Sequence, residues 1–211
     1  MTELSLHLTV DAQYCSPYAM SVFVALKEKQ LPFSLSVLDL DAGANHATAY
    51  AFSSLTARVP ALRHGEFVLS ESSAITEYLQ ENFPGPALYP PSPQDKARAR
   101  QVQAWLRSDL LPLRQERDTL VVFYRPVTTP LSERGLAAAH KLVRVAQQLL
   151  LPGRDFLFEQ WSIADVELAL MLNRLRLNGD ALPARLADYA ALQWQHPAVQ
   201  QWLALPRPVL G

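Results

Sequence analysis

The first forty residues change from a period of two to helical spacing and back again. Between residues 4 and 10, leucines alternate with polar residues, which is typical of a half-buried β-strand. Residues 17–30 carry apolar side chains at helical spacing and start with Ser-Pro, a common helix start. Residues 33–40 alternate again. A strand, a helix and a second strand predict a right-handed βαβ unit with parallel strands.

A hairpin and another helix are predicted after a segment of weak periodicity. Residues 41–57 are small and polar, and they predict only a short irregular helix and loop. Two apolar segments then flank a turn at Gly65, which indicates a β-hairpin. Pro60 is expected at the first residue of its strand, because proline inside a ladder removes a hydrogen bond. With a helix after residues 70–73, the order β-α-β-α-β-β-α is thioredoxin-like.

Proline density divides the chain in two. Five of the residues from 84 to 93 are prolines, which stop helices and strands. Helical spacing dominates from there to the end, with Pro112 expected to kink or end the first long helix. The sequence thus predicts an α/β thioredoxin-like domain over residues 1–84, a linker over 85–94 and an all-α domain over 95–211.

Composition narrows the class of protein. The 211 residues carry a net charge of −1, so no basic face for nucleic acid or an acidic membrane is expected. Apolar runs are far shorter than the roughly 20 residues of a membrane span, and the N-terminus lacks a signal-peptide pattern. The single cysteine excludes an internal disulfide, and the five histidines lack metal-ligand spacing. We expect a cytoplasmic protein without a metal, nucleic acid or membrane partner.

The turn Ser70-Glu71-Ser72-Ser73 forms a helix N-terminus rich in hydroxyl groups. Unpaired backbone N–H groups and the positive end of the helix dipole gather at such a position. An anion such as a ligand carboxylate is favoured there. An ordinary N-capped helix accounts for the same residues equally well.

The Val59-Pro60 pair before the hairpin and the Glu71-Ser72 pair at the helix start resemble the glutathione-binding half of soluble glutathione transferases. The resemblance extends over essentially the full length, because that family joins a thioredoxin-like domain to a helical one. It is closest to the serine-type branches and to a bacterial subgroup. It includes the S-x-x-D capping box of the family's helical domain, here Ser162 and Asp165, whose expected role is folding.

The resemblance implies a role for each matching position. Val59, as the residue before a cis-proline, pairs through its backbone with the cysteinyl part of glutathione. Glu71 and Ser72 hold the γ-glutamyl end. Arg58 neutralises the glycyl carboxylate, or is simply a surface arginine. Glutathione is then the cosubstrate, without a metal, and a homodimer is expected.

Glutathione reacts as a thiolate, and a free thiol with a pKa of about 8.5 is ionised to only a few per cent at neutral pH. A hydroxyl that donates to sulfur at a helix N-terminus stabilises the anion. In serine-type transferases the active hydroxyl directly precedes a proline at the helix start, so the resemblance assigns this role to Ser16, before Pro17. N-capping is the other account of this serine.

Three neighbours of Ser16 compete for the catalytic role. Tyr14 lies near the position of the hydroxyl in tyrosine-type transferases, although closer to the helix. Cys15 would be the nucleophile of a C-x-P pattern and would carry out mixed-disulfide exchange. Tyr18 fits helix packing equally well.

Three functions follow from these residues. The first is a transferase that conjugates glutathione to electrophiles in detoxification, or reduces peroxides under oxidative stress. The second is a Cys15-dependent glutathione thiol transferase, and the third is a transferase fold kept as a non-catalytic interaction module. The electrophile is expected to bind in the helical domain, near Trp105 and Leu106 and the Phe123-Tyr124 loop.

Overall fold

The computed structural model describes residues 5–48, 50 and 54–209. These residues form two compact units, one from residues 1–88 with 201–211 and the other from residues 89–200. The predicted start of the first strand at residue 4 lies outside the described residues, and so do residues 49 and 51–53 of the weakly periodic segment.

The described residues of the first unit form a mixed sheet of four strands in the order β2-β1-β3-β4. β1 and β2 are parallel, whereas β3 is antiparallel to both β1 and β4. Its elements along the chain are β1 (Leu6–Asp11), α1 (Pro17–Glu28), β2 (Ser34–Leu38), the short 3-10 helix η1 (Ala44–His46), β3 (Ala61–His64), β4 (Phe67–Ser70) and α3 (Ser72–Asn82). This is the predicted succession of strands and helices.

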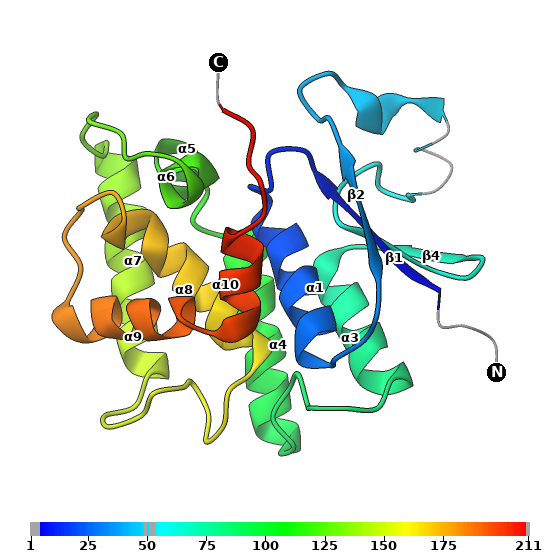
Figure 1. Ribbon diagram of the computed structural model, residues 1–211. Helices are drawn as coiled ribbons and strands as arrows, with labels where there is room; N and C mark the ends of the chain where they lie inside the picture. The colour runs from blue at the N-terminus through cyan, green and yellow to red at the C-terminus, as the bar shows by residue number, and fades with distance from the viewer. Residues whose placement is uncertain (1–4, 49, 51–53, 210–211) are drawn as a thin grey trace. The chain divides into compact units, whose positions relative to one another are not determined.

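Helices α1 and α3 pack against each other and against the sheet, as Figure 1 shows. The alternation predicted for β1 is observed, because its apolar side chains are buried while His7 and Thr9 are half-buried. Burial of this apolar surface, at about 25 cal/mol per Å², is the main contribution to the stability of the unit. The core contains Leu8, Val10, Met20, Leu26, Leu62, Ile75 and Leu79.

The hairpin differs from its prediction by one residue. β3 begins at Ala61, so Pro60 directly precedes the strand instead of occupying its first position. Proline has no N–H to give to a ladder, which explains why pairing starts one residue later. The turn places Gly65 at a φ of 59°, which glycine adopts without steric cost.

The second unit is helical. Its helices are α4 (Pro93–Ser108), α5 (Leu111–Glu116), α6 (Thr119–Phe123), α7 (Glu133–Leu149), α8 (Ile163–Arg176), α9 (Ala184–Trp194) and α10 (Pro197–Leu203), the last of which continues past residue 200. α8 packs against α4, α6, α7 and α9, and nearly all of its side chains are buried.

Prolines start helices in this unit where the sequence suggested that they end them. α4 begins at Pro93, inside the segment expected as linker, because Ser92 caps it by accepting from the N–H of Asp95. Pro112 lies in the first turn of α5, after Leu110 with a φ of 61°, and thus opens a new helix. Proline is tolerated there because first-turn N–H groups have no intrahelical acceptor.

Asp165 at the start of α8 is fully buried and accepts four hydrogen bonds. The donors are the N–H groups of Leu157 and Ser162 and the hydroxyls of Ser162 and Tyr189, at 2.7 to 2.9 Å. The predicted partnership of Ser162 and Asp165 is therefore present. Every contact of the carboxylate is internal to the unit, as expected for a residue that serves folding.

The end of the chain groups with the first unit, whereas the sequence suggested one helical domain up to residue 211. Trp202 has no exposed surface, and its ring meets those of Tyr14 and Phe23 edge-on, with centroids 5.7 and 5.3 Å apart. Arg207 donates a hydrogen bond to the carbonyl of Tyr14. Aromatic packing of this kind accounts for the grouping.

Candidate functional site

The sheet register brings three loops to one end of the first unit. Ala61 of β3 lies opposite Thr9 of β1 and opposite Ser70 of β4. Because β1 and β4 end where β3 begins, the loop after β1, the segment before β3 and the turn after β4 meet at the same edge. These three segments contain all the site residues predicted from the sequence.

The loop after β1 is held by Asp11, which is 4% exposed. One carboxylate oxygen accepts from the N–H of Cys15 at 2.6 Å, and the other accepts from the N–H of Ser16 at 3.0 Å. Tyr14 has a φ of 52°, an uncommon conformation for a residue with a side chain. Asp11 thus fixes the backbone that presents Ser16.

Ser16 is the N-cap of α1, and its hydroxyl oxygen accepts from the N–H of Ala19 at 3.2 Å. A hydroxyl that accepts in this way keeps its proton to donate to another group. Pro17 follows in the first turn, as predicted. Ser16 therefore lies at the positive end of a twelve-residue helix with a proton to donate.

Cys15 is buried, and its thiol donates to the carbonyl of Gln13 at 3.4 Å. This contact directs the thiol proton into its own loop. The carboxylate of Asp11, which lies beside this loop, accepts from the backbone N–H groups of Cys15 and Ser16.

The segment before β3 contains the cis peptide bond between Val59 and Pro60. The ladder with β1 ends at Ala61, so Val59 lies two residues beyond the last paired residue of β3. The backbone N–H and C=O of Val59 are therefore not part of this ladder. Arg58 is exposed. Ala57 has a φ of 50°, a second departure from the usual backbone regions next to a predicted site residue.

The turn after β4 contains the third such departure. Glu71 has a φ of 71° and a ψ of 109° and is the N-cap of α3, without a capping bond from its side chain. Its carbonyl accepts from the N–H of Ile75. Ser72 is the first residue of the helix and is buried. Non-glycine residues held in such regions cost about 1–3 kcal/mol each and concentrate at functional sites.

Three residues that support the site were not predicted from the sequence. Asp11 holds the loop that carries Ser16. The sequence signal for this role was a carboxylate at the end of a buried strand, five residues before a Ser-Pro helix start. Tyr50 and Ser54 both donate to the carbonyl of Arg58. These two lie in the weakly periodic segment, where no pattern distinguishes them from other polar residues.

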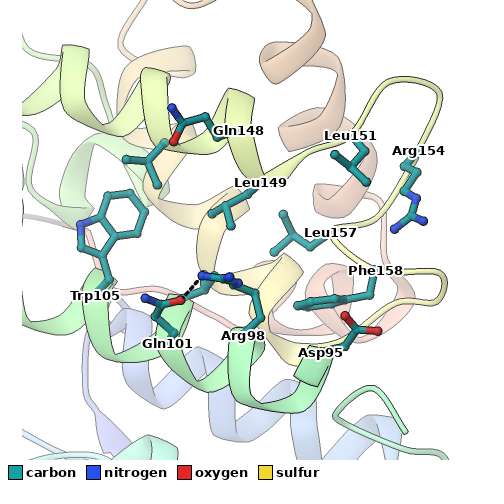
Figure 2. Close-up of a pocket in the computed structure, with 12 residues that line it drawn as sticks. Asp95, Arg98, Gln101, Trp105, Gln148, Leu149, Leu151, Arg154, Leu157 and Phe158 are labelled. Atoms are coloured by element: carbon teal, nitrogen blue, oxygen red, sulfur yellow. Dashed lines mark hydrogen bonds between the residues drawn. The ribbon is translucent and has the colours of Figure 1, made fainter. Parts of the chain in front are cut away.

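A separate cavity of about 600 Å³ lies within the helical unit, as Figure 2 shows. Trp105, one of the residues expected near an electrophile, lines it, whereas Leu106 is buried in the core and Phe123 packs near Trp194. Its remaining lining residues come from α4, α7 and the segment after α7: Asp95, Arg98, Gln101, Val102, Val145, Gln148, Leu149, Leu151, Arg154, Leu157 and Phe158.

The described part of the chain contains no group of three or more histidine, cysteine, aspartate or glutamate side chains able to hold a metal ion. Among the described helices, none combines the length and apolar character that crossing a bilayer demands.

Two protein-family models together match most of the chain. A model of the N-terminal domain of glutathione S-transferases matches residues 12–87, and a model of the C-terminal domain matches residues 93–207. Human glutathione S-transferase theta-1 is 33% identical over 152 residues, which are 70% of this chain. The match spans 60% of the human protein's length.

Two solved structures extend the likeness over nearly the whole chain. A glutathione transferase homologue from Burkholderia BGR1, solved with bound glutathione, is 40% identical with a TM-score of 0.77, over 94% of this chain and 96% of the other. A maleylacetoacetate isomerase from Methylobacterium extorquens AM1, solved with malonate and glutathione, is 26% identical with a TM-score of 0.74, over 96% and 98%. The predicted thioredoxin-like and helical domains are confirmed, and the chain belongs to the glutathione S-transferase family.

Proposed function

We propose that this protein is a glutathione transferase, which binds glutathione at the described edge of the sheet and activates its thiol. The observation that supports this most directly is the register of β1, β3 and β4. It brings the loops of Ser16, Val59 and Ser72 together, although 56 positions separate the first from the last in the sequence. The similarity to a homologue solved with bound glutathione supports the same ligand.

Val59 is proposed to align the tripeptide. It lies just past the end of the ladder, where its N–H and C=O extend the hydrogen-bonding edge of β3. An extended peptide segment pairs with such an edge through main-chain hydrogen bonds. The cysteinyl residue of glutathione is the segment that this pairing would hold, which brings its sulfur toward the start of α1.

Glu71, Ser72 and Arg58 are proposed to bind the charged ends of glutathione. The N-terminus of α3 favours the γ-glutamyl α-carboxylate, with the hydroxyl and N–H of Ser72 as donors. The carboxylate of Glu71 matches the γ-glutamyl ammonium group. The exposed guanidinium of Arg58, next to Val59, matches the glycyl carboxylate.

Ser16 is proposed to hold the sulfur as a thiolate. Each unit by which the thiol pKa falls corresponds to about 1.4 kcal/mol of preferential interaction with the anion. A hydrogen bond from a hydroxyl to a charged acceptor contributes about 1.5–3 kcal/mol, so Ser16 and the helix dipole together account for a fall of about one to two units. The thiolate then attacks an electrophilic carbon and forms a thioether, while the leaving group departs with the electrons of its bond to that carbon. With a peroxide, the thiolate attacks one oxygen and breaks the O–O bond, which gives glutathione sulfenic acid and, after protonation by water, an alcohol; a second glutathione then converts the sulfenic acid to the disulfide and water.

The contacts of Cys15 favour Ser16 as the active residue. The thiol of Cys15 donates to the backbone carbonyl of Gln13 within the loop, whereas the hydroxyl of Ser16 lies at the N-terminus of α1. The two alternatives are a Cys15-dependent thiol transferase and a non-catalytic interaction module. The experiments described below distinguish each of them from a Ser16-dependent transferase.

The remaining proposals rest on the family. We assign the electrophile to the helical domain, in which Trp105 lines a cavity. A cytoplasmic homodimer acting in detoxification or in the response to oxidative stress agrees with the family resemblance. Sedimentation of the purified protein tests the dimer, and fractionation of the source cells tests the location.

Calorimetric titration with glutathione tests the proposed site. Ser72→Ala should weaken binding about tenfold, because the variant loses a donor to the γ-glutamyl carboxylate. Ser73→Ala is the matched control, since it removes a half-buried hydroxyl from the same helical turn and should leave affinity within about twofold. Absence of binding to the unaltered protein would contradict the transferase and favour an interaction module.

A further inference from the structure

Two consecutive carbonyl groups just before Val59 are held by side chains instead of by secondary structure. Asn45 donates from Nδ2 to the carbonyl of Ala57 at 3.1 Å. Tyr50 and Ser54 donate from their hydroxyls to the carbonyl of Arg58 at 2.8 and 3.2 Å. We call Asn45, Tyr50 and Ser54 the carbonyl clamp. Asn45 belongs to η1, and Tyr50 and Ser54 lie between η1 and the cis peptide bond.

The backbone at the clamp departs from the usual conformations. Ala57 has a φ of 50°, and its N–H donates to the carbonyl of Ser54 at 3.0 Å. A conformation of this kind persists only when surrounding contacts determine it. Ser54 is 1% exposed, so a donor buried to that extent has little solvent to compete for its hydrogen bond. The clamp supplies contacts that keep this turn in one geometry.

The geometry of a peptide group carries the effect of the clamp to Val59. The carbonyl of Arg58 and the N–H of Val59 belong to one planar peptide unit, in which they point in opposite directions. Fixing the carbonyl toward Tyr50 and Ser54 therefore aims the N–H of Val59 away from them. Val59 lies beyond the last paired residue of β3, so this N–H is directed outside the ladder.

We propose that Tyr50 and Ser54, supported by Asn45, are positioning residues that aim the Val59 N–H at the cysteinyl carbonyl of glutathione. This inference rests on the proposed function, because it deepens the role given to Val59. The three residues do not touch the reacting sulfur. They lower the cost of binding by holding the peptide in its bound orientation before glutathione arrives.

The protonation of Tyr50 agrees with its role as a donor. Burial raises the pKa of the Tyr50 hydroxyl, against a smaller opposing effect of its hydrogen bond with Ser54. The hydroxyl therefore keeps its proton through the neutral range, and the hydrogen bond to Arg58 persists there.

The test compares Tyr50→Phe, Ser54→Ala and the double variant by calorimetric titration with glutathione. Loss of one hydrogen bond should weaken binding roughly three- to tenfold, and the double variant should lose more than either single one, since one donor can no longer replace the other. In steady-state assays with an activated aryl chloride, KM for glutathione should rise by a similar factor. The kcat at saturating glutathione should stay within about twofold, because Ser16 is unaltered.

Tyr78→Phe is the matched control. Its hydroxyl bonds His64 at 2.8 Å, at the opposite end of β3 from Val59. This variant removes an equally short hydrogen bond from the same unit and should lower the melting temperature without changing glutathione affinity. A clamp that served only folding would likewise change the melting temperature and leave affinity and KM intact.

The outcomes separate the two proposals. If the unaltered protein binds glutathione and the double clamp variant binds it equally well, the clamp inference is wrong and the transferase stands. If the unaltered protein does not bind glutathione, both are overturned. Weaker binding in the clamp variants together with unchanged binding in Tyr78→Phe would support the inference.

Discussion

At the scale of single residues, the hydroxyl of Ser16 is the group on which the proposed chemistry depends. Ser16→Ala should raise the pKa of the bound glutathione thiol by about one to two units, because a donor to the charged sulfur is lost. It should lower kcat/KM at neutral pH about a hundredfold, as removal of a donor to a developing anion does. The ultraviolet absorbance of the bound thiolate, followed against pH, measures the first effect directly.

Cys15→Ala is the control for Ser16→Ala, since it changes the adjacent residue. The thiol of Cys15 donates a hydrogen bond to the backbone carbonyl of Gln13, so kcat/KM for conjugation should change less than about threefold. The opposite pattern, with activity lost in Cys15→Ala and kept in Ser16→Ala, would identify a thiol transferase that acts through a mixed disulfide.

Glu71 allows stability and function to be separated at one position. Glu71→Gly should raise the free energy of unfolding by about 1 kcal/mol, because glycine adopts a φ of 71° without the cost that a side chain brings. It should also weaken glutathione binding about tenfold through loss of the carboxylate. Glu71→Ala keeps the strain and loses the carboxylate, so it should weaken binding without the gain. Urea unfolding of both variants measures the change in stability, and calorimetric titration measures the change in glutathione affinity. If Glu71→Gly binds glutathione as tightly as the unaltered protein, Glu71 is not part of the binding site.

At the scale of elements, the sequence predicted those parts of the fold that depend on local periodicity. β1 and α1 followed from alternation and a Ser-Pro start, and the three loops of the site followed from residue pairs with a family resemblance. The carbonyl clamp could not be predicted, because its hydrogen bonds join side chains of a weakly periodic segment to backbone carbonyls several residues further along the chain. The helices α5 and α6 were missed because they are only six and five residues long, too short for helical periodicity to show, and α5 also contains a proline.

One ion pair connects the end of α5 to the turn after α8 and should make the helical unit sensitive to acid. Arg117 donates to both oxygens of Asp180 at 2.6 and 2.9 Å. This pairing, aided by a hydrogen bond from Asn178, lowers the pKa of Asp180 below its ordinary value of 3.8, against the opposing effect of burial. A lowered carboxyl pKa stabilises the fold above the unfolded pKa and ceases to do so as pH falls through the folded value.

Asp180→Asn tests the contribution of this pair. The variant should lose about 2 kcal/mol of unfolding free energy at neutral pH, since a largely buried arginine is left without its counter-ion. The difference from the unaltered protein should be constant between about pH 5 and 7 and shrink below about pH 4. Asp188→Asn, at an exposed position on α9, should cost less than about 0.5 kcal/mol. A difference that does not change with pH would show that the charge of Asp180 is not what stabilises the unit.

At the scale of the whole molecule, the last residues of the chain return to the unit formed by its first residues. Residues 201–211 follow the helical unit in sequence but group with residues 1–88. Periodicity could not reveal this, because an amphipathic helix shows that it has a buried face and not which surface covers it. The contacts of Trp202 and Arg207 reach Tyr14, two residues before Ser16. The C-terminal segment therefore supports the loop that carries the proposed catalytic hydroxyl.

Trp202→Ala should reveal that support in both stability and binding. Removing a fully buried tryptophan should cost about 3–5 kcal/mol of unfolding free energy, and the loop of Tyr14 loses its packing partner. Glutathione affinity of the folded protein should fall several-fold as a consequence. Trp194→Ala removes a buried tryptophan from the helical unit instead, so it should lower stability and leave affinity unchanged. Denaturant unfolding with calorimetry below the transition measures both; equal affinities in the two variants would mean that the C-terminal segment stabilises the fold without shaping the site.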